Sequence, residues 1–149
     1  MQYGWKKSST VLNNKCGTRR GIICISIDAC QNLCNNETPE SSLYPKVNIC
    51  INLEKAQGTA ICNKTSNPVF SQSFLMEYKD YTTDIININV INSRNKDCLG
   101  NTTISLGHVF EFENHEIIRS VYMLEDGINM EASITVTAKL YFIETEQKK

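Results

Sequence analysis

Apolar and polar residues alternate along most of the chain with a period of two, the spacing of a β-strand with one buried face. The clearest example covers residues 132–142. Its apolar positions are Ala132, Ile134, Val136, Ala138, Leu140 and Phe142. Three more segments alternate in a similar way, at residues 47–53, 70–78 and 86–90. The pattern therefore predicts strands.

Weaker strand patterns occur at residues 21–28, 59–64, 101–106 and 118–124, with turn signals such as "SNP" and "EDG" between segments. Hardly any segment has a helical pattern, although residues 106–116 fit one short turn of helix. About eight short, regularly spaced strands are typical of an antiparallel sandwich. We therefore predict an all-β fold, an eight-stranded antiparallel β-sandwich.

The chain has 149 residues, about the size of one domain. No run of 18 apolar residues occurs, so the sequence predicts no membrane span. The start, "MQYGWKKSSTVLNNK", lacks the apolar core of a secretory signal.

The net charge of −1 is unevenly distributed. Residues 1–20 carry five cations and no acid, namely Lys6, Lys7, Lys15, Arg19 and Arg20. The remainder carries 16 acids and 10 bases (15 minus 5), which gives −6. An acidic body disfavours nucleic acid and anionic lipid. We interpret the basic start as a solvated linker, with a weak lipid contact as the alternative.

Seven cysteines are spread along the chain without a CxxC pair, so the spacing of a zinc site is absent. We expect reduced, cytosolic thiols. A secreted, disulfide-linked sandwich is the alternative, and a thiol count would separate the two. The sequons at Asn36, Asn63 and Asn101 are expected to be chance matches in an Asn-rich chain.

Four segments resemble the C2 domain family in order and spacing. They are "IDACQNL" (27–33), "NKTSNPVFSQSF" (63–74), "IININV" (85–90) and "DCLGNTTISL" (97–106). The "CLGN" loop exit, the missing "SDPY" motif and the last segment are similar to the second, calcium-independent C2 domain of the extended synaptotagmins. Of two C2 connectivities related by circular permutation, the resemblance favours the synaptotagmin-like one.

The resemblance also implies the domain boundaries. Residues 21–143 would form the C2 domain, and residues 144–149 a polar C-terminal tail. Residues 1–20 would be a basic linker or the remnant of a preceding domain, because "QYGW" resembles the end of a C2 strand.

In calcium-binding C2 domains, carboxylates from two loops surround the ion, which takes about six to eight oxygen ligands. At the corresponding positions of the third loop this chain has Asn92 and Arg94, and only Asp97 remains. Asn92 retains a carbonyl oxygen, but Arg94 brings a fixed positive charge. The first loop offers no Asp, only Glu37 and Glu40. We therefore expect no calcium and no other cofactor; Asp97 would cap a turn or pair with Arg94.

C2 domains also bind phosphoinositides through a lysine-rich strand on their concave face. Here that strand, "KVNICINLEK", carries only Lys46 and Lys55, a weak patch to which Lys64 and Lys79 would add if they lie nearby. His108 and His115 lie among glutamates without a nucleophile and paired base, so we expect no enzyme.

The resemblance implies a module of a tether between the endoplasmic reticulum and the plasma membrane, active in lipid transport. It would be peripheral, on the cytosolic side, with the membrane anchor outside this chain. Its partner would be a neighbouring C2 domain or another protein, and it would bind no nucleic acid. The alternative is a peripheral phospholipid binder. Candidate lipid or partner contacts are Lys6, Lys7, Arg19, Arg20, Arg94 and Lys96.

Overall fold

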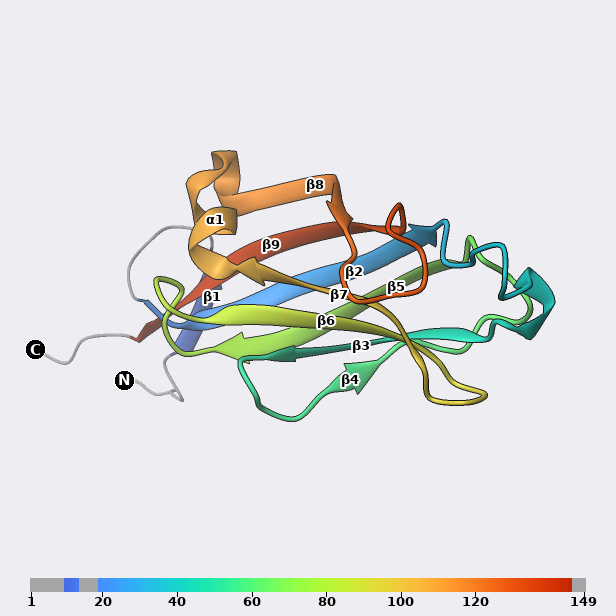
Figure 1. Cartoon of the computed structure of the whole chain (residues 1–149). Coiled ribbons are helices and arrows are strands. Elements are labelled where there is room, and N and C mark those ends of the chain that lie inside the picture. Colours follow the sequence, from blue (N-terminus) through green and yellow to red (C-terminus); the bar gives the residue numbers. More distant parts are fainter. Residues whose placement is uncertain (1–9, 14–18, 146–149) are drawn as a thin grey trace, which may run out of the picture.

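The computed structural model describes residues 10–13 and 19–145, which form two antiparallel sheets packed face to face (Figure 1). The first sheet contains β1 (Thr10–Asn13), β9 (Ser133–Thr145), β2 (Gly21–Gln31) and β5 (Val69–Tyr78) in that order, and β8 (Glu116–Met123) also pairs with β9. The second sheet has the order β4 (Gln57–Gly58), β3 (Pro45–Ile51), β6 (Ile85–Asn92) and β7 (Cys98–Ser105). The same part of the chain contains the short helical segments η1 (Glu40–Ser42), α1 (Leu106–Glu111) and η2 (Glu113–His115).

The predicted all-β sandwich is confirmed, and so is the short helical turn after residue 106. The core forms where the alternating faces of the two sheets meet. Ile23, Ile25 and Ile27 of β2 lie opposite Leu140, Ala138 and Val136 of β9, and all six are fully buried. Burial of apolar surface contributes about 25 cal/mol per Å², so the burial of these core faces is the main stabilising term.

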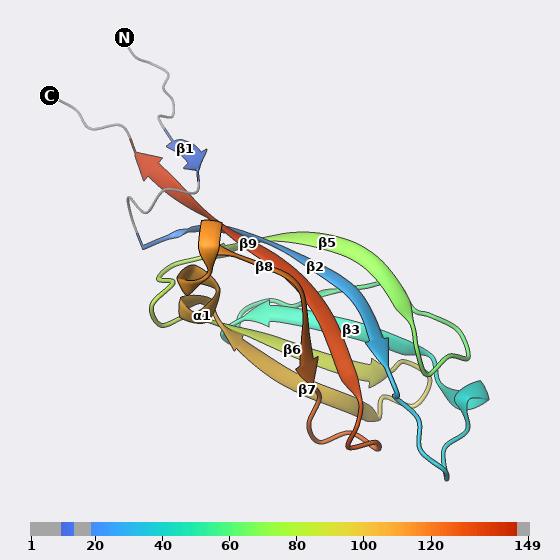
Figure 2. The same cartoon turned by 90° about the horizontal axis from the view of Figure 1, so that it is seen from above.

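The strand that enters the first loop, β2, lies between β5 and the last strand, β9. Because β9 runs antiparallel to β2, the last residues of β9 lie beside the start of β2, at the end of the sandwich opposite that loop. There β1 pairs with the end of β9, with Asn13 opposite Phe142 and Thr10 opposite Thr145. Figure 2 shows this two-stranded ribbon projecting from the sandwich. The predicted domain boundaries stay predictions, although residues 10–13 form a strand that the sequence pattern did not predict. Lys6, Lys7, Lys15 and Cys16 lie outside the described residues.

One predicted strand is absent, and another ends earlier than predicted. Residues 59–64 form no strand, because the side chain of buried Thr59 takes the place of a backbone partner and accepts the N–H of Val47. The strand predicted at 47–53 ends at Ile51. Asn52 has a left-handed backbone (φ 54°), which turns the chain and leaves Leu53 96% exposed.

The six cysteines in the described part of the chain are all unpaired. Burial raises the pKa of the Cys30 thiol to about 12, so this group stays protonated and acts as a small apolar core residue. No helix within residues 10–13 and 19–145 has the length and apolarity that a membrane crossing requires.

Candidate functional site

Loops from both sheets gather at one end of the sandwich, at the right in Figure 1, and we call this surface the loop end. It consists of residues 32–44, 59–68, 93–97 and 124–132. Backbone hydrogen bonds join the loops: Leu33 N–H donates to Ser66 O, Thr65 N–H to Leu43 O and Ser93 N–H to Tyr44 O. The loops are therefore held in one arrangement by the chain itself.

Asn92, at the end of β6, is the residue that joins the first and third loops most directly. Its side chain is only 2% exposed. The amide oxygen accepts the N–H groups of Tyr44 (3.0 Å) and Arg94 (3.3 Å), and Nδ2 donates to Ser42 O (3.0 Å). The oxygen that the sequence left available for a cation therefore already has two donors. We call these bonds the Asn92 clamp.

Hydrogen bonds to Asn92 and Ser93 hold both the backbone N–H and the backbone carbonyl of Tyr44. Its N–H donates to Asn92, and its carbonyl oxygen accepts both the N–H and the hydroxyl of Ser93 at 2.9 and 2.8 Å. The guanidinium of Arg94 then lies over the tyrosine ring, 4.6 Å from its centroid. Such cation–π contacts stabilise the pair by roughly 0.5–1 kcal/mol at exposed sites. A fixed positive charge thus occupies the space between the two loops.

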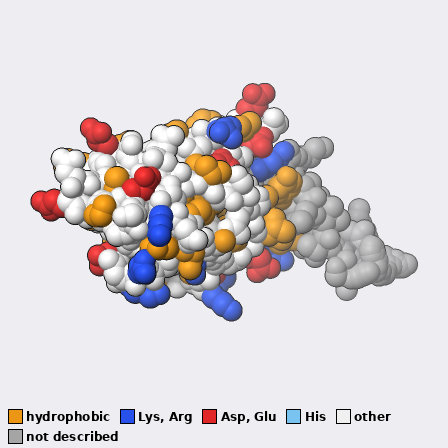
Figure 3. Space-filling model, turned by 90° about the vertical axis from the view of Figure 1, so that its right-hand side faces the viewer, with side chains coloured by type: hydrophobic (Ala, Val, Ile, Leu, Met, Phe, Trp, Pro, Cys, Tyr) orange, Lys and Arg blue, Asp and Glu red, His pale blue; other side chains and the backbone are white. Residues whose placement is uncertain are grey.

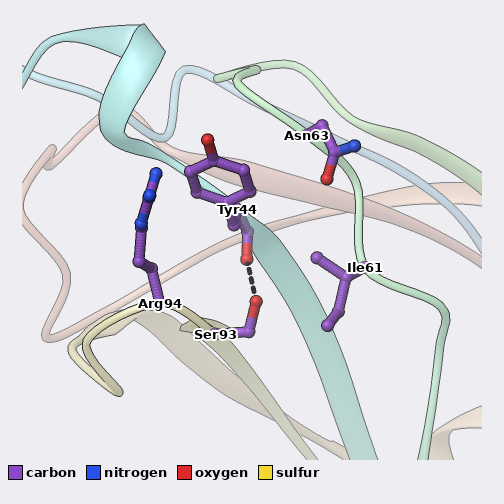
Figure 4. Close-up of a pocket in the computed structure, with 5 residues that line it drawn as sticks. All are labelled: Tyr44, Ile61, Asn63, Ser93 and Arg94. Carbon is purple, nitrogen blue, oxygen red and sulfur yellow. Dashed lines mark hydrogen bonds between the residues drawn. The ribbon is translucent and has the colours of Figure 1, made fainter.

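A shallow pocket of about 320 Å³ opens beside this stack. Figure 4 shows its lining, Tyr44, Ile61, Asn63, Ser93 and Arg94, with the guanidinium and the phenol side by side. Ile61 is 51% exposed, so the pocket combines an accessible apolar side chain with a cation. Such a surface suits a ligand with an anionic group next to an apolar part.

The carboxylates proposed for a weak calcium site do not converge. Glu40 accepts the N–H and the hydroxyl of Ser66, each at 2.9 Å, and these two bonds hold the pKa of its carboxyl below the usual value. Glu37 and Asp97 are exposed. The expected Arg94–Asp97 ion pair is not found in the described part of the chain, because Arg94 turns to Tyr44. Residues 10–13 and 19–145 contain no group of three His, Cys, Asp or Glu side chains that could hold a metal ion.

Asp97 does belong to a turn, but through its backbone. Its N–H donates to the side chain of Asn95 at 3.0 Å, and its carbonyl oxygen accepts the N–H of Asn92 at 2.8 Å. Lys96 takes a left-handed conformation (φ 68°) to close the turn. Gly100 (φ 142°) follows at the loop exit, where a Cβ would meet the side chain of Leu124 at 2.6 Å. The "DCLG" segment is therefore a tight loop exit.

Basic side chains gather on part of the loop end, and acids lie around its margin (Figure 3). Lys64, Arg94 and Lys96 are exposed in these loops, and Lys46 begins the adjoining strand β3. The rest of the outward row of β3 and β6 is neutral, with Asn48 directly opposite Asn89. As the sequence predicted, strand β3 therefore carries few lysines on its outward face.

The remaining predicted cations lie elsewhere. Lys79 follows β5 at the opposite end of the sandwich and pairs with Glu54 at 3.2 Å, so it does not extend the patch of Lys46. Arg19 also lies at that end and contacts Asp80 at 3.8 Å. Arg20 precedes β2 there. Arg19 and Arg20 therefore cannot share a surface with Arg94 and Lys96.

The two histidines have packing roles. The ring of His115 is stacked on Phe110 at 4.3 Å, and its Nδ1 lies 2.7 Å from the carbonyl oxygen of Phe110. His108 packs edge-on against Phe112. Neither imidazole ring is placed beside a hydroxyl or thiol nucleophile by these contacts.

Sequence reasoning missed the roles of Tyr44, Ile61 and Ser93. The missing "SDPY" motif drew attention to an absent acid, not to the tyrosine in its place. The sequence did contain a signal. In this strand Ile86, Ile88 and Val90 face the core, and the polar residue Asn92 falls at the next core-facing position. Such a residue needs hydrogen-bond partners from a neighbouring loop.

Comparison with known families finds that the C2 domain model matches residues 21–124. Comparison with curated protein sequences finds no match. Among solved structures, the chain is similar to a structure of extended synaptotagmin 2 that holds the SMP domain and two C2 domains. The identity is 20% over 89% of this chain and 30% of that one, with a TM-score of 0.78.

Two further structures are similar. A single C2 domain of a plant extended synaptotagmin 1 has 17% identity over 87% of this chain and 99% of that one, with a TM-score of 0.68. Human GIVD cytosolic phospholipase A2 has 13% identity over 88% of this chain and 17% of that one, with a TM-score of 0.67. The similarity to these three structures supports the fold of the chain. The chain spans less than half of the multidomain extended synaptotagmin 2 structures that it matches.

The Asn92 clamp predicts that Asn92→Asp destabilises the domain. The substitution replaces the Nδ2 donor to Ser42 O with an oxygen and also buries a charge. A buried polar group that loses its partner costs about 1–3 kcal/mol of stability. The control is Asn95→Asp in the same loop, because Asn95 is exposed and uses only its oxygen. Urea denaturation measures both variants. Equal free energies of unfolding for Asn92→Asp and the wild type would contradict the clamp.

The Glu40–Ser66 contact predicts an acid-dependent stability. The pKa of Glu40 is lower in the folded state than its ordinary value of 4.5, so the contact stabilises the fold above that value and is lost as the pH falls through the folded pKa. Thermal midpoints measured from pH 6 to pH 3 should fall more steeply for the wild type than for Glu40→Gln. Parallel curves would show that the contact contributes nothing; Glu37→Gln is the matched control.

Proposed function

The chain belongs to the C2 domain family, and we propose that it is a calcium-independent interaction module of a tether like the extended synaptotagmins. In this proposal it lies peripherally on the cytosolic side of contacts between the endoplasmic reticulum and the plasma membrane. It acts there in lipid transport as a spacer or docking domain and not as an enzyme. The Asn92 clamp is the observation that carries the proposal.

The Asn92 clamp supports calcium independence because its hydrogen bonds take the place of a bound calcium ion. In a calcium-dependent domain the ion joins carboxylates of two loops and holds them together. Here hydrogen bonds from Asn92 and Ser93 join the same two loops. Arg94 adds a cation that repels a metal ion from the space between them. The loop end is thus ordered by protein groups alone.

The position of the loop end supports a docking role. β1 and the end of β9 lie at the opposite end of the sandwich (Figure 2), so the chain leads away from the loops. The loop end then faces outward, free to contact a neighbouring C2 domain, another protein or a membrane.

A second candidate is a peripheral phospholipid binder that uses the loop tips. The pocket favours it, because exposed Ile61 lies next to Arg94, with Lys64 and Lys96 nearby in the loops. An apolar side chain among cations suits the boundary between anionic headgroups and acyl chains. Arg19 and Arg20 would not take part, since they lie at the other end.

Calcium titration tests the leading proposal. Calorimetry with millimolar calcium chloride should give no saturable heat, and the thermal midpoint should not change between calcium and chelator, because no cluster of carboxylates in the described part of the chain gains from the ion. A micromolar dissociation constant would contradict calcium independence.

Vesicle sedimentation tests the second candidate. If the loop tips bind lipid, phosphatidylserine vesicles should retain the domain without calcium, and Arg94→Glu with Lys96→Glu should weaken binding at least tenfold, since each basic residue contributes about 1 kcal/mol near an anionic surface. The control, Arg19→Glu with Lys55→Glu, reverses two cations away from the loop end and should bind as the wild type does. No sedimentation of the wild type, or equal loss in both variants, would exclude the loop tips as the lipid contact.

A further inference from the structure

A groove separate from the loop end lies between η2 and the first half of β8, near the top left of Figure 1. Its volume is about 320 Å³, and its lining includes Phe112, Glu113, Glu116 and Ile118. We call it the β8 groove. None of its residues belongs to the surface proposed above for the function of the domain.

The β8 groove presents two large apolar side chains to solvent. Phe112 is 45% exposed and Ile118 is 66% exposed. Phe112 follows α1, and its ring packs against that of His108 in a T-shaped arrangement. Ile118 faces outward because it follows buried Ile117 in the strand, and a β-bulge lies beside it, where the register shifts by one residue between Ile117 and Ser120. The fold itself therefore directs these groups away from the core.

The bulge also decides what kind of ligand fits. At its centre Arg119 has a left-handed backbone (φ 47°), and its N–H turns away from solvent and donates to Thr137 Oγ1 at 3.0 Å. The Thr137 hydroxyl in turn donates to Asp28 at 3.1 Å. A bulge on an edge strand prevents another strand from pairing there. The groove thus suits an inserted side chain and not an added strand.

Carboxylates surround the two apolar groups. Glu111 and Glu113 are exposed and Glu116 is half-buried, and none of the three forms an ion pair in the described part of the chain. Two cations lie near. Lys139, opposite Glu116 in the sheet, places its ammonium over the ring of Tyr141 at 5.5 Å, and Arg119 is exposed on β8. The local balance, three acids against two bases, leaves a net negative charge beside the groove.

We propose that the β8 groove docks a basic segment of a partner protein that carries one large apolar side chain. The side chain would enter between Phe112 and Ile118, and its flanking lysines or arginines would face Glu111, Glu113 and Glu116. Charge selects a protein segment over an anionic membrane, because carboxylates at this surface repel anionic lipid. Apolar anchors surrounded by complementary charge are the usual basis of such recognition.

The test is fluorescence anisotropy. The probe is a labelled eight-residue peptide that contains one tryptophan and three lysines around it. Replacing Glu113 and Glu116 with lysine (Glu113→Lys with Glu116→Lys) should weaken binding at least tenfold at low salt. The matched control, Glu77→Lys with Glu131→Lys, makes the same change of net charge at exposed sites elsewhere and should stay within twofold of the wild type. A peptide with glutamates in place of the lysines should not bind.

The apolar part of the proposal has its own pair of variants. Ile118→Ser should weaken binding about fivefold, whereas Leu53→Ser, at a side chain that is 96% exposed, should not change it. Circular dichroism checks that each variant is folded. No binding by the wild type, equal losses in the two charge-reversed proteins, or equal affinity for the glutamate peptide would overturn the proposal. The variants at Glu113, Glu116 and Ile118 leave the loop end unchanged, so their outcome is independent of the calcium and vesicle experiments.

Discussion

A buried polar group must find hydrogen-bond partners, and this requirement on Asn92 determines the arrangement of the loop end. Its amide is surrounded by protein, so its oxygen and its Nδ2 group must find partners locally, and these belong to Ser42, Tyr44 and Arg94. The same requirement operates at the opposite end. Burial alone would raise the pKa of Asp84, yet the N–H groups of Asp80 and Lys79 and the amide of Asn52 hold it below its usual value. Each end of the sandwich is thus organised around one buried side chain.

The sheets could be predicted from the sequence because burial alternates along each strand, as in residues 132–142. The segments at 59–64 and 52–53 could not, since side-chain bonds at Thr59 and a left-handed backbone at Asn52 override the pattern. Short β1 lacks the length for a visible alternation. At the loop end, the sequence pointed to Asn92 and Arg94 in place of two acids and to Asp97 as the acid that remains, and the absence of calcium binding stays a prediction. It could not show that Arg94 contacts Tyr44 instead of Asp97, because Tyr44 is far from Arg94 in the chain and the two meet only in the folded structure.

The loop end and the β8 groove differ in chemistry. At the loop end, Arg94 lies beside exposed Ile61, whereas at the β8 groove, Glu113 and Glu116 lie beside Phe112 and Ile118. Both surfaces rest on rigid features, a clamped loop and a bulged strand. A domain with both proposed sites would join an anionic surface to a basic protein segment, which suits the proposed role of a spacer in a larger tether.

The ribbon formed by β1 and the end of β9 has a mechanical consequence. The two strands are antiparallel, and Thr10 and Thr145 lie side by side at its open end. A pull that separates residues 10 and 145 would load the hydrogen bonds of the ribbon one after another, starting from this pair. The ribbon would open at low force and lengthen the chain by a few residues on each side, while the sheets behind it keep their packing. If the chain belongs to a protein that spans a gap between two membranes, as proposed, this ribbon would open before the sheets do.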